Sequence, residues 1–120
     1  MGMDQKDQQM IMEISRMGVR AAVLLRGVML KKVDRNTLEW GLQELAPADL
    51  MNKYCPLLTN RSECVSLLNT LFLVYTLESQ LDYQISEYGM DSLKDDLQEI
   101  NFSLQQIGDV FDLAQLKQVI

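Results

Sequence analysis

Four carboxylates stand close together in the C-terminal half of the chain and have the chemistry of a cation site. Asp91, Asp95, Asp96 and Glu99 offer the hard oxygen ligands that Ca²⁺ and Mg²⁺ prefer. The run lacks the alternating ligands and central glycine of an EF-hand loop. It also falls in the first turns of a predicted helix, where negative charge stabilises the positive end of the helix dipole. We therefore interpret the cluster as structural and expect no metal site.

Other reactive side chains are scarce. The sequence contains no histidine, which removes the usual general base near neutral pH and the commonest metal ligand. Cys55 and Cys64 have no further Cys or His to complete a zinc site, and few cations lie near Cys55 in the sequence to activate its thiol. We predict that the protein is not an enzyme, that it has no cofactor, and that both cysteines are free thiols, with a disulfide as the alternative.

Positive charge is concentrated in the N-terminal half. Residues 1–61 carry nine Lys or Arg against seven Asp or Glu, whereas residues 62–120 carry two against ten, which gives net charges of +2 and −8. The candidate anion-contacting residues are Arg16, Arg20, Arg26 and Lys31. They suit an acidic protein, an anionic lipid surface or nucleic acid, although the net charge of −6 disfavours nucleic acid. The interpretation we favour is a solvated face that offsets the chain's own acidic half.

These cations belong to a helix predicted over residues 8–33. Apolar residues recur there at spacings of three and four, which directs one face toward a core. That face consists of Ile11, Ile14, Gly18, Ala21, Ala22, Leu25, Val28 and Met29. A second apolar stripe on the same helix consists of Met12, Val19, Val23 and Leu30. Because one neighbouring helix cannot cover both, this helix is either central to the bundle or buried in an interface, and we expect the second stripe to contact a partner protein or a second copy.

One or two short helices are predicted between the first and second long helices. Asp34 or Asn36 can cap the first of them. Pro47 suits the first position of the second, and Pro56 ends it.

A second long helix is predicted over residues 61–88, after a start rich in capping residues and before Gly89. Its segment 65–77 is apolar on nearly every face. We therefore expect this segment to form the centre of the core.

The last predicted helix covers residues 91–108 or beyond. Its apolar residues follow spacings of 4, 3, 4, 3 and 4, as in a coiled-coil seam: Leu93, Leu97, Ile100, Leu104, Ile107 and Phe111. The part of this stripe from Leu97 to Phe111 is the alternative contact surface for a partner helix. Residues 109–120 have two interpretations, an amphipathic tail that docks on a partner or the last turns of this helix packed on the core.

Together these features predict a single all-α domain over residues 1–120, a bundle of three long helices in which residues 1–8 are disordered. No apolar segment reaches the roughly 20 residues that span a bilayer, and none follows a basic start as in a secretory signal. We therefore expect a cytoplasmic protein without a transmembrane segment, and peripheral membrane contact is the disfavoured alternative. The expected function is a non-enzymatic adaptor, secretion-type chaperone or regulator that binds a partner helix, or itself as a homodimer. The alternative is a regulator that contacts nucleic acid or the transcription machinery through its basic first helix.

Overall fold

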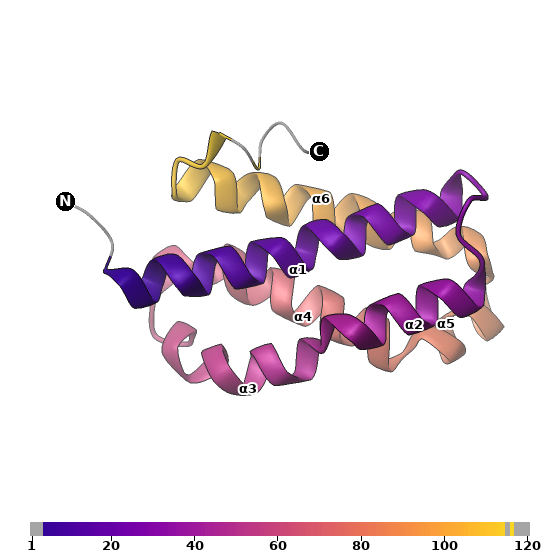
Figure 1. The fold of residues 1–120 in the computed structure, drawn as a ribbon, viewed down its shortest axis with the longest axis horizontal. Coiled ribbons are helices and arrows are strands. Elements are labelled where there is room, and N and C mark those ends of the chain that lie inside the picture. Colours follow the sequence, from indigo (N-terminus) through magenta and orange to yellow (C-terminus); the bar gives the residue numbers. More distant parts are fainter. Residues whose placement is uncertain (1–3, 115, 117–120) are drawn as a thin grey trace.

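A computed structural model describes residues 4–114 and 116 of the chain (Figure 1). These residues are almost wholly helical and contain no strand, which confirms the predicted all-α class. Along the chain the elements are α1 (Gln5–Met29), α2 (Arg35–Leu45), α3 (Pro47–Leu58), the short 3₁₀ helix η1 (Ser62–Cys64), α4 (Val65–Ser79), α5 (Leu81–Tyr88), a second 3₁₀ helix η2 (Met90–Ser92) and α6 (Leu93–Val110).

Helix α1 begins earlier than the sequence predicted. The Asp4 carboxylate caps it by accepting a 2.8 Å hydrogen bond from the backbone N–H of Asp7. The chain is therefore helical from Gln5 onward, in part of the segment 1–8 that was expected to be disordered. Residues 1–3 lie outside the residues that the structure describes.

Helix α1 also ends earlier than residue 33. The backbone N–H groups of Lys32 and Val33 both donate to the carbonyl of Gly27, so the chain turns out of the helix after Met29. Lys31 takes a positive φ of 61° in this turn. The next helix, α2, begins at once because Asp34 caps it through the N–H of Thr37.

The long helix predicted over residues 61–88 is broken into η1, α4 and α5. Ser62–Ser79 and Leu81–Tyr88 are bent by 72° relative to each other. The bend allows Leu81 to enter the core and allows Gln84 of α5 to donate hydrogen bonds to Ser92 and Asp96 near the start of α6. The prediction of three long helices is therefore only partly correct. Tertiary contacts of α5 break a segment whose sequence shows an uninterrupted helical pattern.

Among the residues that the structure describes, no single helix is both long and apolar enough to cross a membrane. Ser62–Ser79 and Leu81–Tyr88 reach that length and composition only when taken together, across their bend.

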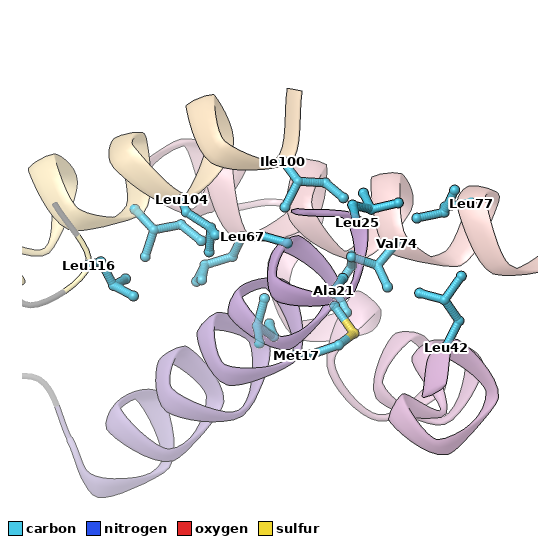
Figure 2. Close-up of a cluster of buried hydrophobic side chains, with 14 of the residues drawn as sticks. Met17, Ala21, Leu25, Leu42, Leu67, Val74, Leu77, Ile100, Leu104 and Leu116 are labelled. Carbon is cyan, nitrogen blue, oxygen red and sulfur yellow. The ribbon is translucent and has the colours of Figure 1, made fainter. Parts of the chain in front are cut away.

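The core lies where α1, α4 and α6 pack against one another pairwise, with α2 and α3 beside them (Figure 1). Figure 2 shows side chains from four helices meeting there: Met17, Ala21 and Leu25 of α1, Leu42 of α2, Leu67, Val74 and Leu77 of α4, and Ile100 and Leu104 of α6. The prediction that residues 65–77 form the centre of the core is correct for one face of α4, which buries Leu67, Leu71, Val74 and Leu77, and wrong for the other, where Val65, Phe72 and Tyr75 are exposed. Because the three long elements already cover one another's inner faces, any further partner must bind on their outer faces.

Candidate protein-binding surfaces

The second apolar stripe of α1 is exposed to solvent. Met12, Val23 and Leu30 keep 59%, 57% and 59% of their surface accessible, while Val19 is half-buried. At 100° per residue the four side chains lie within a narrow arc of the helix, and Arg16 and Arg26 flank that arc on its two sides, with Arg20 further round. We call these seven residues the outer face of α1.

The three arginines of the outer face are available to a partner. Arg16, Arg20 and Arg26 are all exposed, and none forms an ion pair within the described part of the chain. Lys31, which the sequence grouped with them, lies instead in the turn after α1. The outer face therefore combines an apolar centre with positive margins, and on the side of Arg16 and Arg20 these two arginines line a hollow together with Glu13, Glu44 and Asp49.

The heptad stripe of α6 is mostly not available. Ile100, Leu104 and Ile107 are fully buried, and Leu97 and Phe111 are partly buried against the same core. The apolar stripe of α6 packs against α1 and α4 of its own chain. Coiled-coil periodicity predicts that a helix packs on other helices, but it does not distinguish helices of the same chain from those of a partner. In the folded chain Ile100, Leu104 and Ile107 therefore belong to the core, and only Leu97 and Phe111 keep part of their surface accessible.

A groove between α4 and α6 was not foreseen from the sequence. It has a volume of about 720 Å³, and Phe72 of α4 and Phe102 of α6 are exposed in it by 45% and 61%. The described residues that line it are Asn69, Phe72, Leu73, Thr76, Asp95, Asp96, Gln98, Glu99, Phe102, Ser103 and Gln106. Large exposed aromatic rings in a hollow are typical of protein-binding surfaces.

The groove is negatively charged. Asp95, Asp96 and Glu99 line it, and no lysine or arginine does so among the residues described. Burial raises the pKa of the Asp96 carboxyl because it penalises the charged form; the hydrogen bond from Gln84 works in the opposite direction, and the nearby Asp95 adds to the rise. The groove thus offers apolar contact beside a carboxylate margin.

A signal for this groove was present in the sequence. Asp95, Glu99, Phe102 and Gln106 follow spacings of 4, 3 and 4, which places them on one face of α6, separate from its buried stripe. A phenylalanine on an otherwise polar helical face is the feature that could have indicated an exposed contact. The other half of the groove was hidden, since Phe72 lies in a segment that is apolar all round.

The remaining candidate chemistry is not assembled into a site. Within the described residues, no group of three or more Asp, Glu, Cys or His side chains is placed to hold a metal ion. Cys55 and Cys64 are free thiols; Cys64 is buried, and this burial raises its pKa.

Compared with protein-family models, with curated proteins and with solved structures, the chain gives no match.

Proposed function

We propose that the protein is a non-enzymatic interaction protein, an adaptor, secretion-type chaperone or regulator, that binds a helix of a partner protein in the α4–α6 groove. The partner helix would have an apolar face bordered by lysines or arginines. The observation that supports this proposal is the pair of exposed rings, Phe72 and Phe102, in a groove lined by three carboxylates and no cation among the described residues.

The chemistry of the groove accounts for both halves of the proposed ligand. Amphipathic helices bind by placing their apolar face in a hydrophobic groove. Covering the exposed parts of two phenylalanine rings would contribute roughly 1.5–3 kcal/mol, about half of what full burial of two such side chains provides. The carboxylates Asp95 and Glu99 would add attraction for a basic helix and discriminate against an acidic one.

A labelled model peptide tests the proposal. A fluorescein-labelled helical peptide of leucine and lysine, with leucines on one face, should bind the wild-type chain in an anisotropy titration, and added salt should weaken the binding. A peptide with glutamate in place of lysine serves as its matched control and should not bind.

Two protein variants locate the binding. The double variant Phe72→Ser/Phe102→Ser should lower the affinity for the lysine peptide at least tenfold, the equivalent of about 1.4 kcal/mol. Trp40 lies on α2 outside the groove and is 64% exposed, so Trp40→Ser should leave the affinity unchanged. Equal binding of both peptides, or an equal loss in both variants, would contradict the proposal.

The proposal includes a cytoplasmic setting, in which Cys55 and Cys64 would remain reduced. Contact with nucleic acid through α1 has weaker support. Arg16, Arg20 and Arg26 are exposed, yet apolar side chains occupy the centre of that face, and the chain has a net charge of −6. Its test is salt-dependent binding of a DNA or RNA duplex that Arg16→Glu/Arg20→Glu/Arg26→Glu abolishes.

A further inference from the structure

We propose that the outer face of α1 of a second copy of this chain occupies the α4–α6 groove, so that copies associate head to tail and compete with the partner helix. This inference rests on the proposed function of the groove, because it identifies the chain itself as one source of a basic amphipathic helix. Self-association would then regulate how many grooves are open to the partner.

The outer face of α1 has the composition that the groove selects. Its apolar centre runs from Met12 to Leu30, a distance of about 27 Å at 1.5 Å per residue. Arg16 and Arg26 lie on opposite margins of that centre, and both guanidinium groups are without an ion pair among the described residues. An arginine on each margin can meet carboxylates whichever side of the groove they line.

The groove supplies the matching pattern. Phe72 and Phe102 would contact the apolar centre of the incoming helix. Asp95, Asp96 and Glu99 would face its arginines. Apolar surface and charge are therefore complementary at the same contact, which is the argument for this occupant.

Two other arrangements fit less well. If two copies of α1 paired through their outer faces, Arg16 and Arg26 of each copy would oppose like charges. The face also cannot reach the groove of its own chain. Since α1, α4 and α6 contact one another pairwise, the hollow between the outer sides of α4 and α6 lies away from α1, which stands in front of α4 in Figure 1.

A contact between two different faces on opposite sides of a molecule is heterologous. Such contacts add copies one after another unless the rotation closes a ring. The expected assembly is therefore one whose mass keeps rising with concentration, rather than the closed homodimer that the sequence suggested.

Sedimentation velocity of the full chain over a range of concentrations at low salt tests the inference. The wild type should exceed twice its monomer mass of 13.8 kDa as concentration rises, and salt should reverse this. Arg16→Glu/Arg26→Glu makes both surfaces acidic, and Asp95→Lys/Glu99→Lys makes both basic, so each variant alone should remain a monomer. An equimolar mixture should regain association, because each surface then meets one of opposite charge.

Controls separate this inference from the proposed function. Lys31→Glu/Lys32→Glu changes the same number of charges outside the outer face and should associate as the wild type does. A wild type that stays monomeric, a closed dimer, or a mixture that stays monomeric would overturn the inference. If the lysine peptide still binds such a monomer, the proposed function stands and only self-association fails; if it does not bind, both fail.

Discussion

Gly18 lies at a close approach of α1 to both α4 and α6. A Cβ atom at this position would lie 2.8 Å from Thr70 Cγ2 and 2.9 Å from Leu104 Cδ2. Thr70 is held in place, since its hydroxyl donates to the carbonyl of Ser66 at 2.9 Å and lies 2.6 Å from the hydroxyl of Ser103. The glycine therefore allows α1, α4 and α6 to contact one another closely. These three helices form the core, and their outer sides carry both proposed surfaces.

We expect Gly18→Ala to destabilise the protein by up to about 2 kcal/mol. Overpacking a core costs roughly 1–3 kcal/mol, and the better helix propensity of alanine returns at most about 1 kcal/mol. Gly41→Ala is the matched control. Its added Cβ would lie 2.8 and 3.0 Å from the two Cδ atoms of Leu24, a half-buried side chain that can rotate away, and meets no second helix contact of the kind that Thr70 makes at Gly18. Urea unfolding measures both variants; equal stability of the two would contradict the role given to Gly18.

At the scale of helices, local signals predicted some ends and missed others. Pro56, expected to end its helix, lies inside α3 (Pro47–Leu58), and α1 covers Gln5–Met29 rather than residues 8–33. Asp34 was one of two residues suited to cap α2, and it does so through the N–H of Thr37. The break at Gln80 between α4 and α5 has no glycine or proline to mark it. It arises from contacts that α5 makes with the start of α6, which lie outside the range of any helical pattern.

The hydrogen bond between Gln84 and Asp96 joins α5 to α6. Because Asp96 is titratable, the contribution of this contact to the stability of the fold depends on pH. Burial raises the folded-state pKa of Asp96, so the folded protein holds this proton at pH values where the unfolded chain has released it. The contribution of Asp96 to stability therefore falls as pH rises from the unfolded pKa through the folded one, and above the folded value the full penalty of a buried charge applies.

We therefore expect Asp96→Asn to be more stable than the wild type at pH 7, because asparagine carries no charge and its amide oxygen still accepts from Gln84. The difference should shrink as pH is lowered toward the ordinary pKa of an aspartate. Urea unfolding at several pH values measures it, with the exposed Asp91→Asn as a control that should show little change. A variant less stable than the wild type at neutral pH would rule out this account of the joint.

At the scale of the whole molecule, the charge asymmetry of the sequence becomes two surfaces on different sides of one bundle. The second apolar stripe that the sequence predicted on α1 is largely exposed, at Met12, Val23 and Leu30, and its contact with a partner stays a prediction. The sequence did not identify the α4–α6 groove, because a groove is made by two helices together. Phe72 and Phe102 are separated by 30 positions, and only the packing of α4 on α6 places them in one hollow.

If the outer face of α1 and the α4–α6 groove bind each other, self-association requires opposite charges on the two surfaces, whichever of them is positive. The variant Arg16→Glu/Arg26→Glu/Asp95→Lys/Glu99→Lys exchanges the signs, so its acidic outer face should enter the basic groove of the next copy. We expect this variant to self-associate about as strongly as the wild type in sedimentation velocity, while in the anisotropy assay it should bind the glutamate peptide in preference to the lysine peptide. If the variant associates but keeps the lysine preference, the copies do not contact each other through the groove. If it fails to associate while circular dichroism shows that it is folded, charge complementarity does not hold the copies together.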